Sequence, residues 1–96
     1  MSLFVVTNVH SAEACPSGDK EMAPMLLQLL SQPNASKFGV DIQASAVLDG
    51  KHTLQMILEA ADTAKVQEFM SPFSQMGSVD IEPANRCETV VERGRC

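Results

Sequence analysis

Four side chains in this sequence belong to the types that bind metal ions or act as nucleophiles. His10, Glu13 and Cys15 fall within six residues, directly after an apolar stretch, and His52 lies in the middle of the chain. Imidazole nitrogen, thiolate sulfur and carboxylate oxygen together suit Zn²⁺ or another divalent transition metal ion. The His-x-x-Glu-x-Cys spacing is not an established zinc motif, so a metal site here depends on a fold that brings His52 to the other three.

The same residues are compatible with two other roles. Cys15 is expected just before a helix N-terminus, where the helix dipole and a nearby histidine base would favour the thiolate, so it is a candidate catalytic thiol. Alternatively, the histidines cap strand ends and Glu13 is solvated. In that case Cys15 packs as a small apolar residue. The sequence leaves all three interpretations open.

Composition restricts the class of protein. The 96 residues, of which 45% are hydrophobic and 20% charged, predict one globular domain (1–96) with a core at about 3–83 and a tail at 84–96. No apolar run reaches the ~18 residues of a membrane span. The net charge of −5 and the absence of Trp and Tyr argue against a nucleic-acid partner.

The cellular location is expected to be cytoplasmic. The first residues carry neither the positive flank nor the long apolar segment of a secretion signal. The cysteines, Cys15, Cys87 and Cys96, are odd in number and widely spaced, which predicts reduced thiols rather than a disulfide framework.

Hydrophobic periodicity predicts the regular elements in order. Residues 3–9 suit a strand buried on both faces, and the loop 11–18 contains the turn residues Pro16, Ser17 and Gly18, followed by Asp19 as a helix cap. A helix beginning near Pro24 follows, with one further turn at 34–38 that ends at Gly39. Its apolar stripe consists of Met22, Met25, Leu26, Leu29 and Leu30.

The second half of the chain predicts a hairpin, a helix and a strand. Strands at 40–48 and 51–60 flank Asp49-Gly50, and a three-residue loop, 49–51, would pair Ala46 with Leu54, Ala44 with Met56 and Ile42 with Leu58. Asp62 caps a helix with an apolar face of Val66, Phe69, Met70 and Phe73. The last strand spans 78–82. In the tail, 89–91 would form an edge strand or cross to a partner, and 93–96 would be mobile.

This element order predicts an α+β, ferredoxin-like βαββαβ fold. In that topology a four-stranded antiparallel sheet has the order 4-1-3-2, with two helices on one face. The end of the first strand then lies beside the start of the third. His10 and His52 are therefore expected at one edge of the sheet, with Glu13 and Cys15 in the loop above them.

The chain resembles the ferredoxin-like proteins of the dimeric α/β-barrel superfamily over residues 3 to about 83. It also resembles an uncharacterised set of bacterial proteins with a His-x-x-Glu-x-Cys-Pro segment and a later His-Thr-Leu, here His10, Glu13, Cys15, Pro16 and 52–54. Superfamily members include cofactor-free oxygenases, isomerases and haem enzymes. Because fold alone does not determine function, these activities are not transferred to this chain.

A homodimer is expected, because the strand at 3–9 is apolar on both faces and the helices cover only one of them. A symmetric partner would pack on the second face, where the polar or mixed residues of the other strands lie: Asp41, Gln43, Ser45, Val47, Thr53, Gln55, Ile57 and Glu59. The same face could line a pocket for a small polar ligand.

Three functions remain at this stage. The working hypothesis is a protein that binds a metal ion or small ligand at His10, Glu13, Cys15 and His52. The first alternative is a small-molecule enzyme, isomerase or cofactor-free oxygenase-like, that uses the sheet cavity. The second is a purely structural or interaction dimer.

Overall fold

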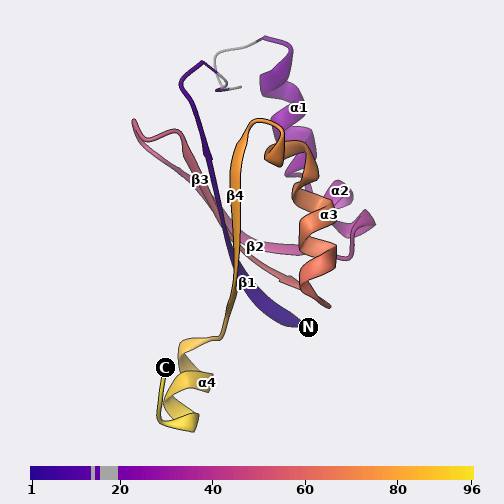
Figure 1. Cartoon of the computed structure of the whole chain (residues 1–96). Helices are drawn as coiled ribbons and strands as arrows, with labels where there is room; N and C mark the ends of the chain where they lie inside the picture. The colour runs from indigo at the N-terminus through magenta and orange to yellow at the C-terminus, as the bar shows by residue number, and fades with distance from the viewer. Residues whose placement is uncertain (14, 16–19) are drawn as a thin grey trace.

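The computed structural model describes residues 1–13, 15 and 20–96 and shows an α+β domain with one antiparallel sheet (Figure 1). The elements in chain order are β1 (Ser2–His10), α1 (Met22–Leu29), α2 (Gln32–Lys37), β2 (Asp41–Leu48), β3 (Thr53–Ala60), α3 (Thr63–Ser74), β4 (Gly77–Ala84) and α4 (Cys87–Arg93). The predicted turn residues Pro16, Ser17 and Gly18, and the predicted cap Asp19, lie outside the described residues.

The sheet has the strand order β2-β3-β1-β4, which reads 4-1-3-2 from the β4 edge. β1 pairs antiparallel with both β3 and β4, so the apolar N-terminal strand is central, as its composition indicates. Helices α1, α2 and α3 lie on one side of the sheet, whereas α4 lies beyond the end of β4, away from them (Figure 1). No helix among the described residues is long and apolar enough to cross a membrane.

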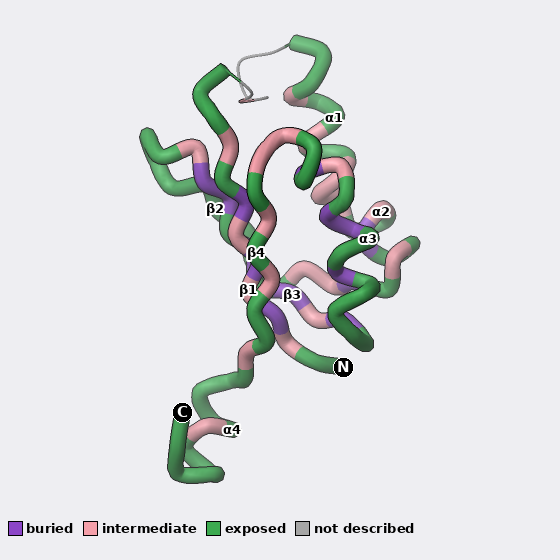
Figure 2. The backbone as a smooth tube through the Cα atoms, in the orientation of Figure 1, coloured by how far each residue is buried: buried purple, intermediate pink, exposed green. Residues whose placement is uncertain are grey.

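The core forms between α3 and the helix-facing side of β1 and β3. The predicted cap is confirmed, because the Asp62 side chain accepts a hydrogen bond from Lys65 N at 3.0 Å. The predicted apolar face of α3 is confirmed as well, with each of its four members at most 1% exposed. Helix α1 is different, since it contains no buried residue although it is mostly apolar (Figure 2).

Strand β1 is buried on one face only in the single chain. Phe4, Val6 and Asn8 face the helices and are buried, whereas Val9, on the other face, is 44% exposed. The expectation of burial on both faces is therefore wrong for one chain, because the helices cover one side of the sheet.

The predicted register of the β2–β3 hairpin is wrong near the turn and right at its far end. The loop has four residues, 49–52, so Val47 pairs with Leu54 and Ala46 with Gln55. A bulge between Ile42 and Ala44 then shifts the register by one residue and restores the predicted pairing of Ile42 with Leu58.

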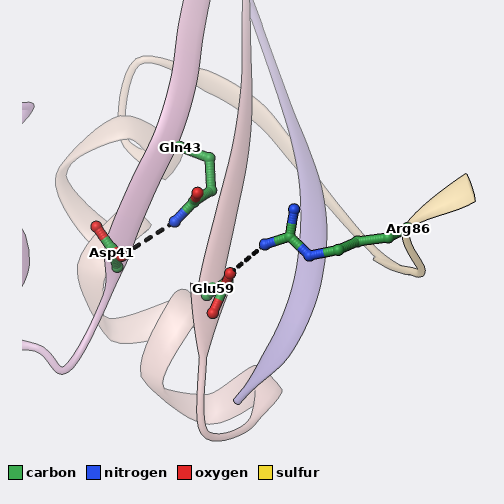
Figure 3. Close-up of polar contacts among 4 residues, drawn as sticks. All are labelled: Asp41, Gln43, Glu59 and Arg86. Carbon is green, nitrogen blue, oxygen red and sulfur yellow. Dashed lines mark hydrogen bonds and ion pairs between the residues drawn. The ribbon is translucent and has the colours of Figure 1, made fainter. Parts of the chain in front are cut away.

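Between the bulge and the turn, each side chain of β2 lies on the face of the sheet opposite to the one predicted. Ser45 and Val47, predicted on the second face, pair with the buried Met56 and Leu54, so they lie on the helix side. Ala44, Ala46 and Leu48 lie on the open face instead. The extra residue, Gln43, donates a side-chain hydrogen bond to Asp41 at 3.0 Å, as Figure 3 shows.

The tail is a helix and not the predicted edge strand. Gly94, with φ of 75°, ends α4, and its N–H donates to the carbonyls of Val90 and Val91. Glu88 in the first turn and Arg93 in the last complement the helix dipole. These features at the two ends of α4 favour a helix by more than the β propensity of residues 89–91 favours a strand. An Arg86–Glu59 ion pair lies just before α4 (Figure 3).

The helical segment before β2 agrees closely with the prediction. Helix α1 begins at Met22, so Pro24 occupies its first turn, and Pro33 lies in the first turn of α2, where a missing N–H is tolerated. Gly39 has the positive φ expected of a helix end, at 71°.

Replacing Gly77 by alanine is expected to destabilise the protein. Gly77 stands opposite His10, and a Cβ there would lie 2.0 Å from the Val9 carbonyl oxygen and 2.9 Å from His10 Cα. Since both are backbone atoms, β1 and β4 must separate, and we expect the free energy of unfolding to fall by roughly 1–3 kcal/mol. Urea denaturation measures this change. The neighbouring exposed Ser78→Ala is the control; equal stability of the two variants would contradict the close approach.

Candidate metal centre

The two histidines meet where the β1–β3 ladder ends. Val9 pairs with Thr53, and one step further the His10 N–H donates to the His52 carbonyl at 3.1 Å. The two imidazole rings lie edge to face, with centroids 5.5 Å apart and an angle of 66° between planes. The two histidines thus converge at one end of the strands, as expected, because antiparallel pairing fixes which residues oppose each other.

The hairpin loop gives His52 an unusual backbone conformation. Its φ is 48°, and it is the one non-glycine residue with positive φ in the part of the chain that the structure describes. The Lys51 N–H donates to the Leu48 carbonyl at 3.2 Å, and the Thr53 hydroxyl donates to the Lys51 carbonyl at 2.9 Å. The turn hydrogen bonds hold this less favoured conformation, which directs His52 toward the end of β1.

Cys15 completes a cluster of three potential metal ligands. The two imidazoles each offer one nitrogen, and these atoms and the Cys15 sulfur all lie within 4.8 Å of one another. All three residues are half-buried. Donor atoms around tetrahedral zinc are separated by roughly 3.3–3.8 Å, from ligand distances of ~2.0–2.3 Å. A contraction of about 1–1.5 Å at most would therefore close the cluster around such an ion.

Glu13, the fourth predicted ligand, does not belong to this cluster. The Cys15 N–H donates to the Ala12 carbonyl at 3.4 Å, so the chain turns tightly here. Glu13 is one of the residues between Ala12 and Cys15, and it is exposed to solvent. The spacing in the sequence placed Glu13 near Cys15 but carried no information on the direction of its side chain.

Among the described residues, His10 has buried polar side-chain atoms without a hydrogen-bond partner. Both of its ring nitrogens are buried, and neither has a hydrogen-bond partner among the residues that the structure describes. A buried polar group left without a partner costs roughly 1–3 kcal/mol. A metal ion bound to one of these nitrogens would remove part of this cost.

The structural argument for a catalytic thiol is weaker than the sequence indicated. Helix α1 begins at Met22, seven positions after Cys15, and the dipole effect is confined to the first turn. The expectation that Cys15 directly precedes the helix is therefore wrong. A thiol–imidazole pair also needs a group that orients the imidazole, and no described residue hydrogen-bonds to the His10 ring.

A cavity of about 430 Å³ adjoins the cluster on the helix side of the sheet. Its walls come from the end of β1, the start of β3, helix α1, the β2–β3 hairpin, the end of α3 and Cys15. They include Asn8, Leu26, Leu27, Leu30, Val47, Leu54, Phe73 and Met76, together with His10, Cys15 and His52. The alternative of a small-molecule enzyme placed its pocket on the second face of the sheet, where the structure has a smaller hollow of about 260 Å³ beside Val5 and Ile57.

Sequence reasoning missed Asn8, which secures β1 beside the cavity. It is only 2% exposed, and its side-chain nitrogen donates to the Ser78 carbonyl at 2.9 Å and to the Phe73 carbonyl at 3.5 Å. The available signal was a polar residue at a core-facing position of an apolar strand, because such a residue is buried only when it is hydrogen-bonded.

We predict that Asn8→Asp lowers stability at neutral pH. The substitution replaces an amide donor by a carboxylate that faces two carbonyl oxygens. The free energy of unfolding should therefore fall by more than about 2 kcal/mol at pH 7. Burial raises the folded-state pKa of such an acid. The difference in unfolding free energy between the wild type and the variant should therefore become smaller as the pH falls and the carboxyl is protonated. Thermal unfolding at pH 4.5 and 7 tests this, with the exposed Asn85→Asp as control. A pH-independent deficit would contradict the assigned donor role.

Comparison with known families matches nearly the whole chain. A family model described as a domain of unknown function (DUF3303) matches residues 3–95. No curated protein matches the sequence. The match extends through β4 and α4, so the helical tail lies within the family's domain.

Proposed function

We propose that this chain, which belongs to the DUF3303 family of domains of unknown function, binds a late first-row divalent metal ion such as Zn²⁺ through His10, Cys15 and His52. The observation that carries the proposal is the meeting of three donor atoms within 4.8 Å. They come from three separate segments: the end of β1, the loop after it and the β2–β3 turn.

The chemistry of the three donors supports a metal ion more than the other roles. Two imidazoles and one thiolate form a mixed nitrogen and sulfur set, which zinc prefers. The buried ring nitrogens of His10 lack partners among the described residues, as expected of a ligand side chain seen without its ion. A strand-end cap would instead show hydrogen bonds from the imidazole to nearby carbonyls.

The three ligands found among the described residues would leave one position of a tetrahedral site for a further ligand. Structural zinc sites use four protein ligands, whereas catalytic sites keep one position for water or a substrate. The cluster therefore fits an ion that exchanges an external ligand. Such an ion would act as a Lewis acid on that ligand, and the protein residues would hold the ion in the half-buried pocket.

Metal uptake tests this proposal directly. Protein purified without an affinity tag and titrated with Co²⁺ under reducing conditions should take up about one equivalent and show thiolate-to-metal absorption. Cys15→Ser, His10→Ala and His52→Ala should each weaken binding by more than the roughly 10–100-fold that loss of an outer-shell partner costs.

The chain offers matched controls for the thiol. Cys87 and Cys96 are exposed and lie outside the cluster, so Cys87→Ser and Cys96→Ser should leave both the stoichiometry and the absorption unchanged. Failure of the reduced wild type to bind Co²⁺ or Zn²⁺ above background would overturn the proposal, as would equal loss of binding in the control variants.

We also propose that the domain is ferredoxin-like and forms a homodimer through the open face of the sheet. The β-α-α-β-β-α-β order before α4 supports the fold. Large apolar side chains on that face are uncovered in the single chain: Val9 is 44%, Ile57 42% and Leu48 38% exposed. A second copy packed face to face would bury them.

Ile57→Asp is expected to dissociate this dimer. A charge at the centre of the open face would face the partner's apolar surface, whereas Gln67→Asp adds the same charge to an exposed position of α3, on the other side of the sheet. Sedimentation velocity should show a wild-type dimer, a dimeric Gln67→Asp and a monomeric Ile57→Asp. A monomeric wild type at micromolar concentrations would refute this arrangement.

A further inference from the structure

The cavity beside the cluster has an apolar rim that the described residues leave exposed. Leu27 is 72% exposed and Val47 58%, and both line this cavity. Large apolar side chains gathered around one hollow mark a binding site more often than side chains scattered singly over a surface. The volume of about 430 Å³ lies within the ~300–1,000 Å³ usual for small-molecule pockets.

The cavity exists because α1 does not pack fully on the sheet. Leu26 and Leu30 are half-buried against the core, yet no residue of α1 is fully buried. The space beneath the helix is closed at the far side by Leu54 and Phe73, which are buried. A ligand in this space would therefore contact apolar side chains along most of its length.

The metal cluster contributes three polar side chains to the cavity, whose other polar lining residues are Asn8, Ser45 and Asp49. His10, Cys15 and His52 all line the same hollow as the leucines of α1. With a divalent ion bound to two neutral imidazoles and one thiolate, the cluster carries a net charge of +1. The free coordination position and this charge both favour an anionic oxygen ligand.

We propose that the cavity binds a small aliphatic carboxylate, with the alkyl chain under α1 and the carboxylate on the metal ion held by His10, Cys15 and His52. This inference rests on the proposed metal site and adds the class of its ligand. An apolar body with one anionic end matches the apolar walls of the cavity and the metal cluster. A sugar or nucleotide would leave its hydroxyl groups without partners against the leucines.

Octanoate binding to the zinc-loaded protein, measured by isothermal titration calorimetry, tests the inference. Octanoate should bind at least about tenfold more tightly than octan-1-ol, which has the same chain without the charge. Affinity should also rise with chain length from butanoate, by up to roughly fourfold for each added methylene that is buried. Removal of zinc with a chelator should abolish the preference for octanoate over the alcohol.

Two exposed positions of α1 supply a matched pair of variants. Leu27→Gln removes an apolar wall of the cavity, and we expect octanoate affinity to fall about fivefold. Met25→Gln makes a similar change at a residue that is 58% exposed and does not line this cavity, so it should bind octanoate like the wild type. Because both positions are exposed, both variants should fold, and zinc uptake should be unchanged.

The outcomes separate this inference from the metal site. Zinc-loaded protein that binds no octanoate, or binds octan-1-ol equally well, overturns the inference and leaves the metal site standing. Equal weakening in Leu27→Gln and Met25→Gln also overturns it, because the alkyl chain would then lie elsewhere. A reduced wild type that binds neither Co²⁺ nor Zn²⁺ above background refutes the metal site and this inference together.

Discussion

The pairing of β1 with β3 is the interaction on which the rest of this structure depends. Its ladder runs from Ser2 opposite Ala60 to Val9 opposite Thr53, and a final hydrogen bond joins His10 to His52. The same pairing aligns Phe4, Val6 and Asn8 with Leu58, Met56 and Leu54 as the floor of the core. A shift of one residue would turn this floor to the open face and separate the two imidazoles. Core packing therefore holds the histidines together.

Strand β4 supplies the second constraint on β1. Gly77 permits the close approach of the two backbones at His10, and Asn8 joins β1 to the segment that leads from α3 into β4. His10 is consequently held between two neighbouring strands, with its ring on the helix side. A ligand side chain on a central strand is positioned more accurately than one on a loop. Cys15 follows β1 and lies outside the sheet, so the strand ladder that fixes His10 does not fix Cys15.

Of the three helices over the sheet, α1 and α3 differ in how they pack on it. Helix α3 is amphipathic, places four side chains in the core and accounts for most of the helix–sheet packing. Helix α1 is more apolar but is less buried, because its position leaves a hollow over the end of the sheet. A fully packed α1 would have made a more stable domain. The incomplete packing gives the cluster an adjoining apolar space, and it explains why the exposed Leu27 lies close to the polar side chains of the cluster.

The order of the elements and the meeting of the two histidines could be predicted from the sequence, because they follow from local periodicity and antiparallel pairing. The alternation in β3, the Asp62 cap and the spacing of Val66, Phe69, Met70 and Phe73 each act over a few residues. The direction of Glu13, the bulge at Gln43 and the conformation of the tail did not follow in the same way. Each depends on which of two conformations of similar free energy is the lower, such as a hairpin loop of three or of four residues.

The sequence by itself determined which elements form and which residues of α3 and β3 enter the core. The reason is that apolar residues recur with the period of a helix, 3.6, or of a strand, 2. Only the tertiary structure decided that Cys15 joins the two histidines while Glu13 remains in solvent. It also decided that a cavity opens beneath α1. The physical reason is that side-chain direction in a turn and incomplete helix packing depend on contacts between distant segments, which no local pattern specifies.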